Sequence, residues 1–240
     1  MNKLLIFILL TLSSRVSYCQ ISHNEWTELL KKHVSNNGQV SYKTFLNDST
    51  KLNHYLSYLE KNGPQESWSK NSLLAYWINA YNAYTVKLIL MNYPVKGIKE
   101  IGGKIPFVNS TWDIKFIKIK GENKDLNYIE HHILRKKFND PRIHMALVCA
   151  SKSCPALRNE AYTEQNIDMQ LDDQCRNFLK DSTRNNITLK EAEISMIFKW
   201  YSGDFKKMGG VNAFINKYSL IKINEETKKS YMSYDWNLND

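Results

Sequence analysis

The sequence predicts an α+β fold: a single helix-rich domain whose central buried helix packs on a small, mostly antiparallel sheet. Residues 73–91 (LLAYWINAYNAYTVKLILM) would be apolar on nearly every side of a helix, as in a membrane span or at the centre of a domain. The interspersed Asn, Thr and Lys residues and the tyrosines argue against a span. Other helical patterns outnumber the extended ones, and no repeat or linker interrupts residues 20–240, which favours one helix-rich domain.

The first 19 residues have the features of a secretory signal peptide. Lys3 supplies a basic start, residues 4–12 are apolar, and Ser17 and Cys19 occupy the small-residue positions of a cleavage site. The apolar run is too short to cross a bilayer. We expect cleavage after Cys19, export to the periplasm or secretion, and no transmembrane segment in the mature chain. Tyr18 argues against lipid attachment at the neighbouring cysteine.

The distribution of charge argues against nucleic acid as a partner. The formal net charge is +9, and it becomes +7 when Lys3 and Arg15 leave with the signal peptide. Basic residues are spread among acidic ones, with no run longer than residues 135–137, whereas nucleic-acid-binding proteins concentrate them in patches. We therefore expect a solvated basic surface, no nucleic-acid partner, and a small-molecule or peptide ligand of unknown identity.

Periodicity and capping residues place the other elements. Ser22 would cap a helix over residues 22–35, and Asp125 would cap one over residues 126–138. Ser69 or Asn71 would cap the central helix, which should end before Pro94 because the residue before a proline leaves the helical region. We also expect helices over 50–61, 164–180, 194–201 and 211–218, and extended segments over 39–42, 111–120, 142–149 and 187–189.

Two asparagines interrupt the apolar surface of the central helix. Asn79 and Asn82 are three residues apart and share one side of it. A buried amide without partners costs about 1–3 kcal/mol. Two interpretations stay open: the amides tie the helix to neighbouring backbone, or they face a site, where they bind a ligand or polarise a carbonyl group.

A carboxylate and a histidine are adjacent on the helix expected over residues 126–138. Glu130 falls within its apolar arc, where a carboxylate must be paired or become neutral, and His131 lies at the edge of this arc. One interpretation pairs Glu130 with Arg135 or Arg142. The other makes Glu130 the orienting group or general acid/base of a site, with His131 beside it.

A segment that ends in a cysteine carries further candidate groups. Alternation over residues 142–149 (RIHMALVC) predicts a strand that begins near His144 and ends at Cys149. In the following loop, Pro155 suits the first position of a helical turn. Cys154 would then be the N-cap, where the pKa of a thiol is lowered. Local physics therefore favours Cys154 as a nucleophile, with Cys149 as the other candidate.

Three interpretations compete for these two cysteines. Cys149 and Cys154 would form a disulfide in an oxidising compartment. They would instead take part in catalysis if His144 or His131 served as the general base. A zinc site built from all four residues is the third interpretation, although their spacing matches no standard ligand pattern, and we expect neither a metal nor another cofactor. Cys175 lies on the inward face of its helix and should be a plain buried thiol.

Five segments of the chain resemble those of one known family. The segments WINAYNAYTV, DLNYIEHHILR, DPRIHMALVCASKSCPALR, IFKWYSGDF and YDWNLN are similar, in this order, to the family catalogued as domain of unknown function 547. The resemblance extends over essentially the whole mature chain and implies no established activity. It marks as a polar signature Asn79, Asn82, Glu130, His131, Arg142, His144, Cys149, Ser151 and Cys154. A looser resemblance is to the papain and transglutaminase superfamily, although here no histidine follows either candidate cysteine.

Together these residues suggest a thiol-dependent hydrolase or transferase that acts on peptide or cell-envelope amide bonds. Cys154 or Cys149 would attack, and His144 or His131 would take the proton. Glu130 would orient the imidazole. The candidates for binding are Asn79, Asn82, Arg142 and Ser151. The alternative is a non-catalytic binding module, in which a Cys149–Cys154 disulfide staples the loop and aromatic residues bind sugars or peptides.

Overall fold

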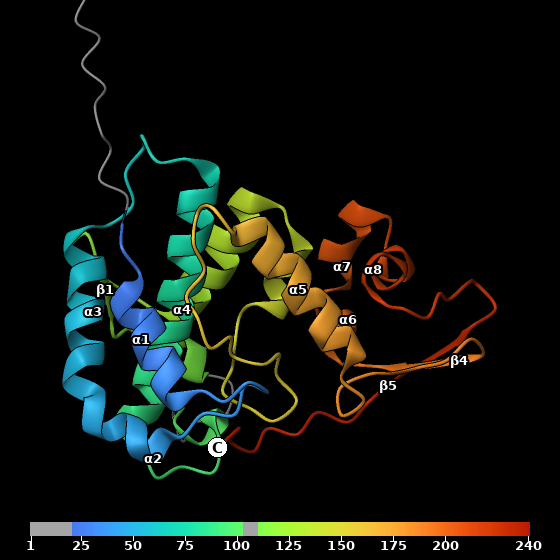
Figure 1. Ribbon diagram of the computed structural model, residues 1–240, viewed down its shortest axis with the longest axis horizontal. Coiled ribbons are helices and arrows are strands. Elements are labelled where there is room, and N and C mark those ends of the chain that lie inside the picture. Colours follow the sequence, from blue (N-terminus) through green and yellow to red (C-terminus); the bar gives the residue numbers. More distant parts are fainter. Residues whose placement is uncertain (1–20, 103–109) are drawn as a thin grey trace, which may run out of the picture.

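Helices dominate the computed structural model, which describes residues 21–102 and 110–240 (Figure 1). The signal peptide expected over residues 1–19 lies outside the described residues. The α-helices are α1 (Asn24–His33), α2 (Tyr42–Phe45), α3 (Ser49–Lys61), α4 (Lys70–Asn92), α5 (Ile167–Lys180), α6 (Ile197–Trp200), α7 (Ser202–Phe205) and α8 (Val211–Tyr218). Helix η4 (Tyr128–Phe138) is π-helical, and the 3-10 helices are η1 (Leu46–Asp48), η2 (Ile98–Glu100), η3 (Thr111–Asp113), η5 (Pro141–Met145) and η6 (Lys206–Met208).

Helix α4 forms the centre of the fold, as its sequence predicts. Ser69 caps it, because its Oγ accepts the Ser72 N–H at 3.1 Å, and the helix ends at Asn92, two residues before Pro94. Its residues are buried on all sides, and α3, η4 and α5 pack against it (Figure 1). A helix can be apolar all round only when neighbours cover every side, so α4 determines where the other helices pack.

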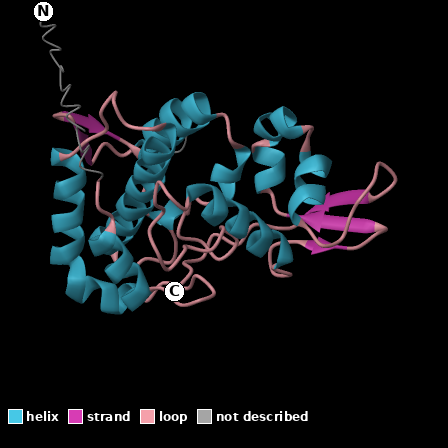
Figure 2. Cartoon of the chain, turned by 45° about the horizontal axis from the view of Figure 1, so that its top comes forward, coloured by secondary structure: helices cyan, strands magenta, loops and turns pink. Residues whose placement is uncertain are grey.

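Two small sheets lie at opposite ends of the molecule (Figure 2). Strands β1 (Ile117–Ile119) and β2 (Glu122–Lys124) pair antiparallel across a turn at Lys120 and Gly121, both of which have positive φ angles, as tight hairpins prefer. In the other sheet, β3 (Asn186–Ile187) pairs antiparallel with β4 (Glu191–Ile194), which pairs parallel with β5 (Lys228–Tyr231). The predicted helix-rich α+β fold class is confirmed.

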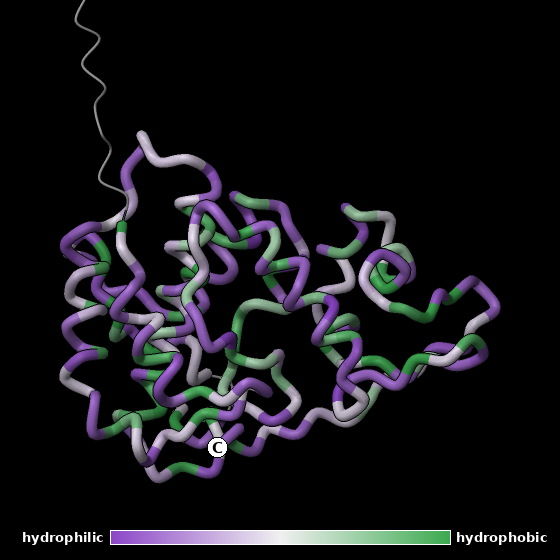
Figure 3. The backbone as a smooth tube through the Cα atoms, viewed as in Figure 1, coloured by the Kyte–Doolittle hydropathy of each residue, from purple (hydrophilic) through white to green (hydrophobic). Residues whose placement is uncertain are grey.

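The buried side chains form two hydrophobic clusters. The larger one surrounds α4 and extends from Ile21 to Leu171, with Leu238 added from the C-terminal segment. The smaller one joins α5, β4 and α8 around phenylalanines that pack edge to face. Outer helices such as α1 and α3 alternate between hydrophobic and hydrophilic residues (Figure 3), so each has one side on the core. No helix within the described residues is long and apolar enough to cross a membrane.

Residues 142–149 do not form a strand, and this prediction is wrong. Asp140 Oδ1 accepts the Arg142 N–H at 3.0 Å, and Pro141 occupies the first helical position, so the 3-10 helix η5 begins here. A turn and irregular chain follow as far as residue 150. Alternation over so few residues does not distinguish a strand from a tight helical turn that continues as coil.

Two other element boundaries are corrected by the structure. Helix α1 has no side-chain cap hydrogen bond, so Ser22 is not its cap. The extended structure expected over 111–120 lies over 117–124 instead, as a hairpin, because Ser110 and Asp113 form a capping box that begins η3. Strands β4 and β5 were not expected, since β4 alternates exposed and buried residues over only four positions and β5 is exposed along its whole length.

The C-terminal segment returns from β5 across the molecule and ends beside α2 (Figure 1). On its way it forms an antiparallel bridge between Ser151 and Leu238. Gly97 permits this route, because a Cβ atom there would lie 2.3 Å from the carbonyl oxygen of Trp236. The segment therefore places Tyr234 and Trp236 against the loop that carries the two cysteines.

Candidate active site

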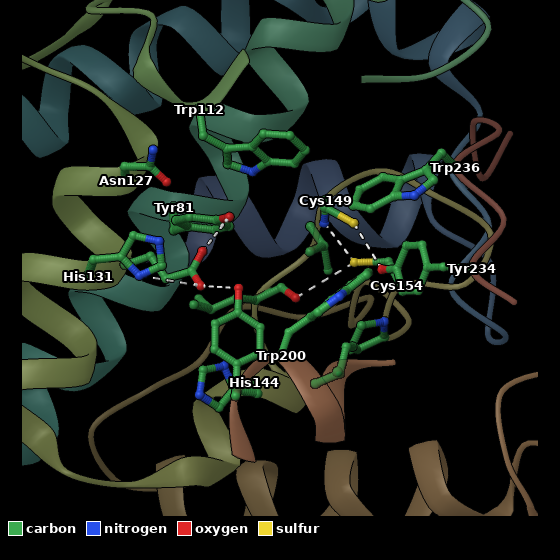
Figure 4. Close-up of a pocket in the computed structure, with 16 residues that line it drawn as sticks. Tyr81, Trp112, Asn127, His131, His144, Cys149, Cys154, Trp200, Tyr234 and Trp236 are labelled. Atoms are coloured by element: carbon green, nitrogen blue, oxygen red, sulfur yellow. Dashed lines mark hydrogen bonds and ion pairs between the residues drawn. The ribbon is translucent and has the colours of Figure 1, made fainter. Parts of the chain in front are cut away.

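A cavity of about 210 Å³ lies where α4, η4, the chain after η5 and the C-terminal segment meet (Figure 4). The five residues predicted to be catalytic all line it: Glu130, His131, His144, Cys149 and Cys154. Much of the remaining lining is aromatic and comes from Tyr81, Trp112, Trp200, Tyr201, Tyr234 and Trp236. The structure thus brings the predicted groups to one place, while their catalytic roles stay predictions.

The two cysteines form one wall of the cavity. Ala150 adopts a left-handed conformation with φ of 56°, and this turns the chain so that the Cys149 N–H donates to Cys154 Sγ at 2.7 Å. Cys149 Sγ lies 3.1 Å from Ser151 Oγ and 3.2 Å from the Tyr234 hydroxyl. Cys149 is partly exposed, whereas Cys154 is buried.

These surroundings give the two thiols different reactivities. Burial raises the pKa of Cys149, but hydrogen bonds from Cys154, Ser151 and Tyr234 outweigh burial and lower this pKa to about 7. Burial raises the pKa of Cys154 well above its usual range, and the Cys154 thiol donates to Leu147 O at 3.9 Å. Cys149 is therefore the thiol that ionises.

The sequence-based preference for Cys154 as nucleophile depended on a helix that does not form. No helix follows Pro155, so Cys154 is not an N-cap and gains nothing from a helix terminus. All three cysteines in the described residues, including buried Cys175, are free thiols, and the Cys149–Cys154 disulfide stays a prediction.

Glu130 lines the same cavity and lies beside Tyr81. It is 5% exposed. Its Oε1 accepts the Tyr201 hydroxyl at 2.6 Å, and its Oε2 accepts the Tyr81 hydroxyl at 3.0 Å. The predicted arginine partner is wrong, because Arg135 and Arg142 both pair with aspartates. Two hydroxyl donors satisfy a buried carboxylate but leave its charge in place.

His131 and His144 belong to one hydrogen-bonded chain of side chains. Arg135 donates from Nη1 to His131 Nδ1 at 3.0 Å and from Nε to Asp204 Oδ2 at 2.6 Å. His144 Nε2 lies 2.9 Å from the same carboxylate oxygen. Arginine can only donate, so Nδ1 of His131 is unprotonated and Nε2 carries the hydrogen. Burial lowers the pKa of His131, which favours this neutral form.

Among the described contacts, none joins His144 to a thiol. The His144 ring is 4% exposed and stacks on the Tyr201 ring, with centroids 3.9 Å apart, while its Nε2 faces Asp204. Figure 4 shows both His131 and His144 on the side of the cavity away from Cys149. The geometry therefore does not support the predicted role of His144 as the base that deprotonates a cysteine.

Asn79 and Asn82 tie α4 to neighbouring backbone. Asn79 accepts from the Tyr162 N–H at 3.0 Å and donates to the carbonyl oxygen of Tyr162 at 2.7 Å. Asn82 accepts from the Val148 N–H at 3.1 Å and donates to Ala146 O at 2.9 Å. Neither lines the cavity, so the structural interpretation of this pair is confirmed. Asn82 nevertheless fixes the chain directly before Cys149.

The other two binding candidates differ from each other. Arg142 lies outside the cavity lining and binds the carboxylates of Asp140, Asp168 and Asp172, so its guanidinium group is occupied by an ion-pair network. Ser151, in contrast, is fully buried, and its hydroxyl contacts the partly exposed thiol of Cys149. It therefore belongs to the site through the thiol that it contacts.

Sequence reasoning missed four groups that complete the site. Tyr81 and Tyr201 hold the carboxylate, Asp204 links the arginine to His144, and Tyr234 contacts the thiol. A signal was present for all four, because Tyr81 lies in WINAYNAYTV, Tyr201 and Asp204 lie in IFKWYSGDF, and Tyr234 lies in YDWNLN. These segments carried the family resemblance, but their tyrosines and Asp204 were not considered as site residues.

The donors expected in the zinc interpretation are divided between the two sides of the cavity. Figure 4 shows the two histidines apart from the two cysteines. Across residues 21–102 and 110–240, no group of three or more His, Cys, Asp or Glu side chains is arranged to hold a metal ion.

Comparison with known proteins relates this chain to one family. No curated protein and no solved structure matches it, so the looser resemblance to papain and transglutaminases has no support. The family model described as "Protein of unknown function, DUF547" matches residues 65–179, a shorter range than the resemblance suggested. This range contains α4, Glu130, His131 and both cysteines of the cavity. The chain therefore resembles the DUF547 family over residues 65–179.

Proposed function

We propose that this protein is an exported thiol-dependent hydrolase or transferase that acts on peptide or cell-envelope amide bonds, with Cys149 as the nucleophile. One observation carries the proposal. A partly exposed thiol with a pKa lowered to about 7 faces a cavity that also holds a buried carboxylate and a histidine. At neutral pH about half of such thiols are thiolates, the form that attacks.

The proposed reaction has two stages. The Cys149 thiolate adds to the carbonyl carbon of the amide, the C–N bond breaks, and a thioester forms while the leaving nitrogen takes up a proton and departs as an amine. Water in a hydrolase, or an amine in a transferase, then adds to the thioester and loses a proton. The C–S bond breaks, which regenerates the thiolate and releases an acid or a new amide.

Three groups around the cavity support these steps. Burial raises the pKa of Tyr234 well above its usual range, so its hydroxyl stays protonated and can stabilise the sulfur anion and the oxyanion that replaces it. His131 presents Nε2–H as a second donor and, after a proton transfer, can protonate the leaving nitrogen. Glu130 places a negative charge beside His131, with 4.0 Å between Oε1 and Nδ1, which opposes in part the burial that lowers the pKa of His131.

The test uses the purified exported protein and a panel of peptidyl amides that release a fluorescent amine. Wild type should release the amine and, after an acid quench, carry the acyl group on the tryptic peptide 143–152, which contains Cys149. Cys149→Ser should reduce release by roughly a hundredfold or more. Cys175→Ser is the matched control, because Cys175 is buried outside the cavity. Equal release by wild type and Cys149→Ser over the whole panel would disprove the proposal.

Export is a separate part of the proposal, supported by the apolar run over residues 4–12 and the small residues before position 20. Mass spectrometry of the protein from the periplasm or the culture medium tests it. The expected mature protein begins at Gln20. A full-length protein that stays with the cytoplasmic fraction would contradict export.

The aromatic lining favours one second candidate, a binding module without catalysis. Trp200, Tyr234 and Trp236 lie in mutual contact, with ring centroids 4.5–5.7 Å apart, and aromatic rings of this kind stack on sugars or peptides. In this case a Cys149–Cys154 disulfide would act as a staple. Reduction should then lower the melting temperature but leave ligand binding, followed by tryptophan fluorescence, unchanged.

A further inference from the structure

Cys154 has no role in acyl transfer, yet it lies against the nucleophile. The Cys149 N–H donates to Cys154 Sγ at 2.7 Å, and Cys149 and Cys154 both line the cavity. The contact depends on the left-handed conformation of Ala150, with φ of 56°, which residues with a side chain rarely adopt. Backbone outliers of this kind concentrate at functional sites. The chain thus holds the partly exposed thiol of Cys149 and the buried thiol of Cys154 together at a conformational cost.

We propose that Cys149 and Cys154 reduce small hydroperoxides, with Cys149 as the attacking thiol and Cys154 as the resolving thiol. The assignment follows exposure, since Cys149 is partly open to the cavity and Cys154 is buried behind it. Cys175 cannot take the second role, because it belongs to the other hydrophobic cluster and is fully buried there.

The proposed reaction is a complete catalytic cycle, in which a hydroperoxide is the oxidant and a dithiol is the reductant. The Cys149 thiolate attacks the terminal oxygen of ROOH, the O–O bond breaks, and a sulfenic acid forms while RO⁻ takes up a proton and leaves as an alcohol. Cys154 loses its proton and attacks the sulfenic sulfur; the S–O bond breaks and water leaves with that proton. The resulting disulfide oxidises the dithiol in two exchange steps, which restores both thiols.

Two hydroxyl groups suit the first of these steps. Ser151 Oγ and the Tyr234 hydroxyl lie 3.1 and 3.2 Å from Cys149 Sγ, so a peroxide oxygen in contact with the sulfur comes within reach of both. Each hydroxyl can redirect its hydrogen from the sulfur to the oxygen that leaves, where negative charge develops. Removal of either hydroxyl should therefore slow oxidation by a hydroperoxide.

The cavity selects a small oxidant over a protein disulfide. Its volume is about 210 Å³, and tryptophan and tyrosine side chains cover the wall around Cys149 (Figure 4). Hydrogen peroxide or a short alkyl hydroperoxide fits such a space, whereas the disulfide of a folded partner would need an open surface at the sulfur. The proposed peroxide reduction and the proposed acyl transfer both use Cys149, but neither reaction requires the other.

Trypsin provides a direct test, because it cleaves between the two cysteines after Lys152. The mature exported protein is first fully reduced and then treated with one equivalent of hydrogen peroxide. Remaining thiols are blocked with iodoacetamide, and the protein is digested without reductant. We expect a disulfide that joins peptides 143–152 and 153–158, while Cys175 in peptide 159–176 is alkylated. With excess dithiothreitol, the protein should consume many equivalents of peroxide.

Variants separate the two roles. Cys154→Ser should form a sulfenic acid at Cys149, which dimedone traps, and should form no disulfide. Cys149→Ser should consume no peroxide. Cys175→Ser, the control, should behave as wild type. Wild-type Cys149 that proceeds to sulfinic acid while Cys154 stays free would overturn the proposal. So would oxidation of the pair by glutathione disulfide but not by peroxide. The same preparations, assayed with peptidyl amides, show independently whether acyl transfer occurs, so either idea can fail alone.

Discussion

Asn82→Ala should lower the free energy of unfolding by about 2–6 kcal/mol, although Asn82 does not itself line the cavity. Its amide is the partner of Val148 N–H and Ala146 O, at 3.1 and 2.9 Å. Ala146 and Val148 are 1% and 2% exposed, so water cannot replace the lost groups. Each buried backbone group left unpaired costs about 1–3 kcal/mol, and the variant leaves two.

Urea unfolding followed by circular dichroism measures this difference, and the dependence of the unfolding free energy on urea concentration should keep its slope. Asn92→Ala is the matched control on the same helix. Asn92 is exposed and its amide donates only to Leu88 O, so its loss should stay within about 0.5 kcal/mol. A loss below about 1 kcal/mol for Asn82→Ala would refute the argument that this amide anchors the chain before Cys149.

Three further results are expected from the site. The rate of Cys149 alkylation by iodoacetamide should rise with pH and reach half its maximum near pH 7, where the thiol ionises; a midpoint near 9 would contradict this. Tyr234→Phe removes a donor to the thiolate and should move that midpoint upward by roughly one unit, whereas an unchanged midpoint would exclude Tyr234 as a donor. Asp204→Asn should cost about 1–2 kcal/mol at neutral pH. Hydrogen bonds from His144 and Arg135 lower the pKa of Asp204 in the folded state, so its contribution is present above its ordinary pKa of 3.8 and is lost as pH falls toward the lowered value. The gap between wild type and variant in thermal melts should therefore narrow below about pH 4.

The parts of the fold that were predictable carried a local signal. Helix α4 is apolar on every side over 23 residues, and no other element type accommodates such a run. The helix that carries Glu130 was predicted from its periodicity, but its π-helical form was not. Strands β4 and β5 pair residue 191 with residue 228. Neither segment alone has a sequence pattern that indicates a partner so far along the chain.

The candidate site likewise divides into residues that a local sequence pattern predicts and residues that no local pattern predicts. A carboxylate on an apolar helix face and two cysteines close in sequence are visible as patterns, and they do meet at the cavity. Their partners were not visible, because Tyr201 is 71 residues from Glu130 and Tyr234 is 85 residues from Cys149. The choice between Cys149 and Cys154 also reversed, since it rested on a helical turn at Pro155 that the chain replaces with coil.

The position of Tyr234 and Trp236 in the chain has a consequence for biosynthesis. A ribosome delivers these two residues after all the other groups that line the cavity. Until they emerge and the bridge between Ser151 and Leu238 closes, Cys149 lacks both its aromatic cover and one hydroxyl neighbour. A nascent polypeptide therefore lacks one of the hydrogen-bond donors that lower the pKa of Cys149, and the surroundings of this thiol are complete only at the end of synthesis.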